Sequence, residues 1–195
     1  MDLTSIPRIL NTDNLQLRPS NPTDAEGMLA MLSDPQSMKY WSDQPISDLD
    51  TAIEVLDKDL ESDAQGNSMC WAITFKGQDK MIGKCILFQF SQENHRAEIG
   101  YILNRKYWRQ GLTYQALGAV IDFAFNTLKL HRIEADIDTE NLASIGLLEK
   151  LGFKREGLFH ERWRVYDEWQ DSLMLGLLKQ DWPGNLAKKA STAEK

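Results

Sequence analysis

A strand pattern that leads directly into a long helix pattern dominates the middle of this sequence. Residues 97–103 form a short apolar run, and apolar residues at helical spacing follow over residues 112–128. Upstream, two apolar runs at residues 70–75 and 81–90 flank a polar turn that contains a glycine, which predicts an antiparallel hairpin. Together these patterns predict a sheet with antiparallel strands that is covered by helices.

The rest of the chain extends this alternation. Helices are expected over residues 21–33, where Asp34-Pro35 interrupts the pattern, and over residues 47–66 and 142–151. Strands are expected at residues 132–138, 158–165 and 169–178. The predicted fold is α+β: one α/β/α domain over residues 1–182, with a mixed, mostly antiparallel sheet between helices. Residues 183–195 begin with Pro-Gly and continue with Lys, Ala and Ser, so we expect a disordered tail.

Composition and charge narrow the possible functions. The chain has 195 residues and a net charge of -7. This negative charge disfavours direct nucleic-acid binding and suits a cationic partner. The alternative is that the negative charge only keeps the protein soluble. No apolar run is long enough to cross a membrane, and the first residues lack the pattern of a secretory signal. We therefore expect a cytoplasmic protein without a metal site, in which Cys70 and Cys85 are buried free thiols.

The junction between the central strand and its helix is a candidate anion site. Residues 107–113 read Tyr-Trp-Arg-Gln-Gly-Leu-Thr and contain the first turn of the helix. The first amides of a helix lack internal partners and the helix dipole adds positive charge, so a phosphate is a favoured ligand. Gly111 would allow close approach of a phosphate, and Arg109 adds a mobile positive charge. No Gly-Lys-Ser/Thr sequence follows, which excludes a P-loop; a plain loop with surface cations is the alternative.

A second motif lies one helix and one strand downstream. Residues 141–153, Asn-Leu-Ala-Ser-Ile-Gly-Leu-Leu-Glu-Lys-Leu-Gly-Phe, resemble the second signature of the GNAT acetyltransferases, in which Asn precedes Ser or Ala and Glu-Lys-x-Gly-Phe closes the motif. The first signature, Gln/Arg-x-x-Gly-x-Gly/Ala, is matched in part: Gly111 fits, whereas Trp108 and Thr113 replace the outer residues. Glu-Ile-Gly-Tyr at residues 98–101 is similar to the branch that acetylates alanine or serine at ribosomal-protein N-termini.

This resemblance spans nearly the whole chain and implies how acetyl-CoA is held. In GNAT enzymes the strand before the turn splays from its neighbour, and its exposed backbone pairs with the pantetheine arm as an added strand would. Asn141 would hydrogen-bond the pantetheine arm and Ser144 would lie near the thioester sulfur, although the same pair is a common helix cap. The residues implied for acetyl-CoA are Tyr101, Ile102, Leu103, Arg109, Gln110, Gly111, Leu112, Thr113, Tyr114, Asn141 and Ser144.

The reaction implied is attack of a neutral amine on the thioester carbonyl. Holding the two reactants together supplies much of the rate, and a strand amide near Ile102 would bind the oxyanion. Glu98 is the candidate base, because burial among apolar neighbours would raise its pKa. The alternative is that Glu98 pairs with a cation such as Arg96 at the strand edge.

The acid that protonates the leaving thiolate is less well defined. Many GNAT enzymes use a Tyr seven residues after the signature Asn, and that position is Leu148 here. Ser144 is the first candidate to replace it, followed by Tyr166, His160 or water. CoA is also a tolerable leaving group, because its thiol pKa is near ~8.5.

The acceptor side carries several aromatic residues. Tyr40 and Trp41 lie between the first two helix patterns, in a loop that borders the acceptor site in this family. They would either enclose the substrate chain or anchor the loop to the core. Trp163 and Trp169, in the last two strands, are expected to be packing residues.

The resemblance implies an enzyme that transfers acetyl from acetyl-CoA to a primary amine, with a protein N-terminus of the ribosomal-protein type as the favoured acceptor. A small amine, such as a polyamine, an amino sugar or an antibiotic, is the second candidate. The third is a non-catalytic acyl-CoA-binding module, which would have no need of Glu98. The oligomeric state is open between a monomer and a homodimer.

Overall fold

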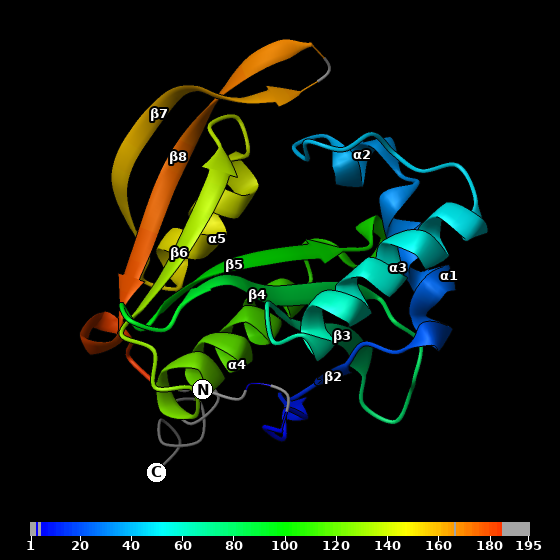
Figure 1. Cartoon of the computed structure of the whole chain (residues 1–195), viewed down its shortest axis with the longest axis horizontal. Coiled ribbons are helices and arrows are strands. Elements are labelled where there is room, and N and C mark those ends of the chain that lie inside the picture. Colours follow the sequence, from blue (N-terminus) through cyan, green and yellow to red (C-terminus); the bar gives the residue numbers. More distant parts are fainter. Residues whose placement is uncertain (1–2, 4, 166, 185–195) are drawn as a thin grey trace.

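The computed structural model describes residue 3, residues 5–165 and residues 167–184 of the chain. Within them the strands form one sheet of eight, in the order β1-β2-β3-β4-β5-β6-β8-β7 (Figure 1). Every neighbouring pair is antiparallel except β5 and β6, which are parallel. Most of the expected tail, residues 185–195, lies outside the described residues. The strands are β1 (Leu10–Asn11), β2 (Leu15–Pro19), β3 (Met69–Phe75), β4 (Gly83–Ser91), β5 (Arg96–Leu103), β6 (Arg132–Asp138), β7 (Lys154–Val165) and β8 (Glu168–Leu178).

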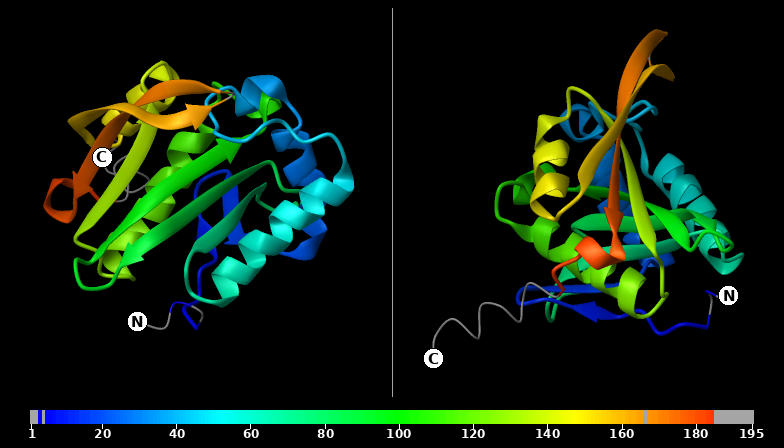
Figure 2. Two further views of the ribbon diagram at one scale, coloured as in Figure 1. Left: turned by 45° about the horizontal axis from the view of Figure 1, so that its top comes forward. Right: turned by 90° about the vertical axis from the view of Figure 1, so that its left-hand side faces the viewer.

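Helices cover both faces of this sheet, as the sequence predicts (Figure 2). One hydrophobic cluster joins the sheet to α4 and α5, and a second joins its opposite face to α1 and α3. None of the described helices is long and apolar enough to span a membrane. The helices are α1 (Ala25–Leu32), α2 (Pro35–Met38), α3 (Leu49–Ala64), α4 (Leu112–Asn126) and α5 (Leu142–Lys150), with 3-10 turns η1 (Pro22–Asp24), η2 (Arg105–Tyr107) and η3 (Lys179–Asp181).

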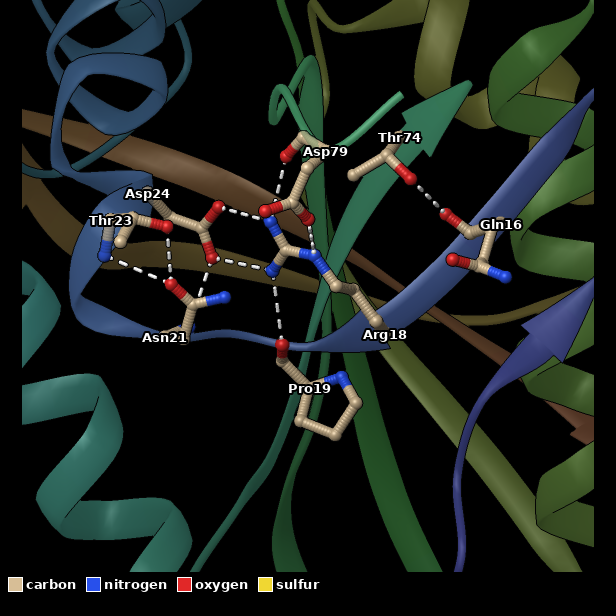
Figure 3. A network of polar contacts seen from close by, with 8 residues as sticks. All are labelled: Gln16, Arg18, Pro19, Asn21, Thr23, Asp24, Thr74 and Asp79. Carbon is tan, nitrogen blue, oxygen red and sulfur yellow. Dashed lines mark hydrogen bonds and ion pairs between the residues drawn. The ribbon is translucent and has the colours of Figure 1, made fainter. Parts of the chain in front are cut away.

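Strand β2 is a part of the fold that the apolar patterns do not predict. Its leucines Leu15 and Leu17 are fully buried. Between β2 and the helices, the Arg18 guanidinium donates two hydrogen bonds to Asp24, at 2.7 and 2.8 Å, and one to Asp79 at 2.5 Å (Figure 3). Asp24 also accepts from the backbone of Asn21, which caps η1 in return. This network joins β2 to the start of the first helical segment and to the β3–β4 turn.

The strands β5 and β6 separate along their length, which makes the sheet splayed as expected. They pair only at Arg96 with Arg132, Ala97 with Ile133 and Glu98 with Glu134. Beyond this point β5 continues along β4 and β6 continues along β8. The edge of β5 that faces β6 is therefore open from Ile99 onward, and Glu98 stands where the two strands part.

Strands β7 and β8 form a long hairpin that projects beyond the helices (Figure 1). β7 begins at Lys154, earlier than the sequence predicts, because it pairs with β8 through a polar stretch. The expectation that Trp163 and Trp169 are packing residues is wrong, since 46% and 59% of their surfaces are exposed. No described helix covers this part of the hairpin, so its side chains face solvent or the space beside β6.

Candidate active site

A pocket of about 420 Å³ lies where β5 and β6 part. Its walls come from α3, β4, β5, β6, the start of α5, the segment after α2 and the β7–β8 hairpin. Figure 1 shows the hairpin and the α2 segment on opposite sides of this end of the sheet. Six residues predicted from the sequence line the pocket together: Tyr40, Trp41, Glu98, Tyr101, Asn141 and Ser144.

Glu98 lines this pocket at the point where β5 and β6 part, and it is half-buried on the face of β5 that looks away from α4. Burial, together with the nearby carboxylates of Asp136 and Glu134, raises the pKa of Glu98 to about 7. Among the described residues it has no hydrogen-bond or ion-pair partner, because Arg96 is ion-paired with Glu134 instead. The edge pairing with Arg96 is therefore not seen, and the raised pKa follows the expectation from burial.

Tyr101 and Ser144 face each other on the α5 side of the pocket. The Tyr101 hydroxyl is buried without a hydrogen-bond partner among the described residues. Burial raises the pKa of Tyr101 to about 12, and the nearby Ser144 side chain lowers this pKa in part. The two hydroxyl groups do not form a hydrogen bond of normal geometry. Asn141 caps α5 by accepting from the Ser144 amide at 3.2 Å, and it lines the pocket as well.

The turn from β5 into α4 lies at the far end of β5, outside the pocket. Gly111 is the N-cap of α4 in the left-handed region, with φ 73°, and a side chain added there would meet no atom within 4 Å. Arg109 also has a positive φ, of 61°, and both residues are exposed. The Trp108 indole donates to the Leu103 carbonyl at 2.7 Å and so ties the turn to the end of the strand.

The predicted coenzyme residues thus fall into two groups. Tyr101, Asn141 and Ser144 line the pocket, whereas Ile102 and Leu103 are buried in the two cores. The residues of the α4 start lie beyond the end of the strand, and the first backbone amide bonded back into the helix is that of Gln115, to Gly111. The α4 start comprises Arg109, Gln110, Gly111, Leu112, Thr113 and Tyr114.

The candidates for a general acid are placed very differently. Leu148, which occupies the position expected for the usual Tyr and cannot donate a proton, is fully buried in the core between the sheet and α5. His160 lies on the hairpin with its side chain 75% exposed, and its Nδ1 is 3.0 Å from Asp171. Tyr166 lies outside the described residues. Of the candidate acids within the described residues, Ser144 lines the pocket and His160 does not.

Tyr40 and Trp41 are both half-buried. Trp41 packs partly against the second core and also lines the pocket. Tyr40 lines the pocket too, and Lys39 lies over its ring at 4.6 Å and donates to its hydroxyl at 3.1 Å.

Several polar residues of the pocket were not predicted. Lys84 of β4 is ion-paired with Asp59 of α3, and Asp136 of β6 is ion-paired with Arg162 of β7. Charged and apolar residues alternate along β6, and this alternation alone does not distinguish a pocket wall at Asp136 from a solvent-facing side. The described residues contain no group of three or more His, Cys, Asp or Glu side chains that could hold a metal ion.

Comparison with known proteins identifies the class. Residues 14–154 match the acetyltransferase (GNAT) domain family. The uncharacterized N-acetyltransferase p20 of Bacillus licheniformis is 35% identical over 175 residues, which are 90% of this chain and 98% of that protein. The chain therefore belongs to the GNAT family of acetyltransferases. It is an N-acetyltransferase that uses acetyl-CoA.

Two further relatives differ in their acceptors. The ribosomal protein uS5-alanine N-acetyltransferase of Escherichia coli is 34% identical over 91 residues, covering 46% of this chain and 47% of that protein. A spermidine N-acetyltransferase from Vibrio cholerae, solved with CoA and spermine, has a TM-score of 0.76 at 22% identity, over 87% of this chain and 98% of that chain. The second likeness shows the shared fold.

Proposed function

We propose that the enzyme acetylates the N-terminal amine of a protein. The observation that carries this proposal is Glu98, a carboxyl with a pKa of about 7 in a pocket that is also lined by exposed or half-buried aromatic residues. Tyr40, Trp41 and Trp163 provide flat surfaces along which a peptide chain can lie as it leaves the pocket. The similarity to a ribosomal-protein N-acetyltransferase supports the same acceptor class.

Acetyl-CoA would enter from the opposite side of the splayed sheet. The free amides at the α4 start, with Arg109, would hold the pyrophosphate, and the open space at Gly111 fits a phosphate there. The pantetheine arm would lie along the open edge of β5 at Tyr101, Ile102 and Leu103. Asn141 would bind this arm, and the unpartnered Tyr101 hydroxyl beside Ser144 offers a donor near the thioester.

The reaction then needs one proton to leave the amine and one to reach the thiolate. Glu98 takes a proton from the acceptor ammonium, and the free amine attacks the thioester carbonyl. The oxyanion rests on an amide of the open β5 edge near Ile102. The carbon–sulfur bond breaks as the amide forms, and Ser144 or water gives a proton to the departing thiolate.

A polyamine is the second candidate acceptor, and the charge of the pocket favours it. Five carboxylate side chains line the pocket, whereas Lys84 is the one cationic side chain that does so among the described residues. A chain with several ammonium groups would be attracted to such a surface. The five are Asp59, Glu98, Asp136, Asp138 and Asp171.

An acceptor panel tests the proposal. The enzyme would be incubated with acetyl-CoA and either peptides that begin with Ala or Ser, the same peptides with blocked N-termini, spermidine, an amino sugar or an aminoglycoside. Release of free CoA thiol and the product mass would be measured. Acetylation of the free-amine peptides at the N-terminus supports the proposal; acetylation of spermidine alone selects the second candidate. Acetylation of the amino sugar or the aminoglycoside alone, or of none of these amines, would contradict both candidates and leave a different acceptor amine.

A further inference from the structure

Asp136 carries a buried oxygen that nothing in the described structure uses. Its side chain is only 4% exposed, and it lines the pocket on β6, just past the point where β5 and β6 part. Oδ2 accepts from Arg162 Nε at 2.7 Å and from Trp163 Nε1 at 3.2 Å. Oδ1 is buried and has no hydrogen-bond partner within the described residues. A buried carboxylate oxygen without a donor is unfavourable, so its presence in a substrate pocket indicates a missing ligand.

The chemistry around Oδ1 selects the kind of ligand. Asp136 and Glu98 lie on the same face of neighbouring strands, because Glu98 pairs in register with Glu134 and side chains alternate along β6. The charge of Asp136 is also one of the causes of the raised Glu98 pKa. Two neighbouring carboxylates favour a cation that can donate hydrogen bonds, and an ammonium group offers three such donors.

We propose that Asp136 binds the ammonium group of the acceptor through Oδ1 and holds it beside Glu98, an inference that rests on the proposed function. The ammonium group then gives one N–H to Asp136 and another to Glu98. After Glu98 removes its proton, the neutral nitrogen keeps the bond to Asp136 and has a free lone pair for the thioester carbonyl. Asp136 is thus an acceptor-binding residue, and the loss of one proton is balanced by its gain on Glu98.

The other oxygen of Asp136, Oδ2, accepts hydrogen bonds from the β7–β8 hairpin. Arg162 and Trp163 both come from β7, so the residue that holds the ammonium group also fixes the exposed hairpin beside the pocket. A purely structural alternative is that Asp136 exists only to hold the hairpin. If Asp136 binds the ammonium group, loss of the charged Oδ1 should weaken ammonium binding. If Asp136 only holds the hairpin, loss of a contact to Oδ2 should weaken ammonium binding just as much.

The test measures binding without turnover. Butylammonium chloride would be titrated into CoA-saturated protein, and the indole N–H signals of Trp41 and Trp163, which both line the pocket, would be followed by NMR. We expect butylammonium to bind the unaltered protein saturably and to bind Asp136→Asn at least roughly tenfold more weakly. Asp13→Asn, the same change in the exposed β1–β2 turn, should bind as the unaltered protein does.

Three outcomes would overturn the proposal. The first is an affinity of Asp136→Asn within twofold of the unaltered protein. The second is that Arg162→Gln, which removes a hairpin contact to Oδ2 at a residue outside the pocket lining and keeps the carboxylate, weakens binding as much as Asp136→Asn does; this would assign Asp136 a structural role.

The third outcome needs no variant. Butyltrimethylammonium has the same charge as butylammonium but no N–H, so we expect it to bind the unaltered protein roughly tenfold more weakly, and equal affinity would exclude a hydrogen bond to Oδ1. Failure of the acceptor panel would not change these results, because no acetyl transfer is involved.

Discussion

Replacing Glu98 by Gln should slow turnover and also stabilise the folded protein. Burial and two neighbouring carboxylates raise the Glu98 pKa from 4.5 to about 7. At 1.36 kcal/mol per pKa unit this difference corresponds to about 3 kcal/mol. Because Glu98 is open to the pocket, solvent screening lowers the usable figure to about 2 kcal/mol. A neutral Gln of similar size removes this cost of burying a charge.

The size of this stability gain depends on pH. The folded protein binds the Glu98 proton more tightly than the unfolded chain does, so its stability falls as the pH rises from 4.5 toward 7. Glu98→Gln should therefore gain about 2 kcal/mol at pH 8, or roughly 4–8 °C in Tm for a chain of this size. Well under half of that gain should remain at about pH 5.

The assay pairs denaturation with kinetics. Urea unfolding of both proteins at each pH gives the stability difference, and Glu93→Gln in the exposed β4–β5 turn controls for a general change of charge. Turnover should fall at least roughly tenfold, as expected for loss of a general base, with CoA affinity by calorimetry unchanged. Equal stability of Glu98→Gln and the unaltered protein at pH 8 would refute the buried-carboxylate argument, and unchanged turnover would remove Glu98 as the base.

Two further predictions concern pH and the coenzyme. The acidic limb of the plot of kcat/KM against pH should follow the Glu98 pKa of about 7, so activity should be lost as the pH falls. A profile that is flat from about pH 6 to about pH 8, roughly one unit on either side of this pKa, would contradict the prediction. Gly111→Asp should weaken CoA binding by roughly tenfold or more, through charge repulsion at the phosphate and strain at positive φ. Gly77→Asp is its matched control, since Gly77 has φ 74° and equal open space in the β3–β4 turn; similar CoA affinity in both variants, by calorimetry, would place the phosphate elsewhere.

Elements with strong periodicity were predictable, and those defined by long-range pairing were not. Strand β6 occupies the predicted residues 132–138, and α4 follows the predicted helix closely. β2 was missed because it has only five residues and ends in Pro19, so its identity depends on pairing with β3. The start of β7 was missed for a similar reason: its polar first residues have no alternation and are ordered by pairing with β8.

The residues of the candidate site also differ in whether local sequence or long-range strand pairing determines their position. Gly111 and Asn141 belong to local motifs, and the special backbone or cap that each provides is written in a few consecutive residues. Asp136 is different, because a charged residue on a half-buried strand ordinarily faces solvent. Only the parting of β5 and β6 after Glu98 and Glu134 turns that face of β6 into a pocket wall. Trp163 was misjudged for the related reason that the hairpin extends past the helices.

The distribution of polar groups in the pocket matches the unequal difficulty of the two proton transfers. A thiolate whose thiol pKa is near ~8.5 leaves without a strong acid, and that side of the site correspondingly offers the weakly acidic hydroxyls of Ser144 and Tyr101, while Leu148 is buried in the core. An ammonium group is harder to deprotonate at neutral pH, and that side holds Glu98 with its raised pKa and the unpaired Asp136 oxygen. The burial that makes Glu98 an effective base is the same burial that destabilises the folded chain, so activity and stability should change in opposite directions when this carboxyl is removed.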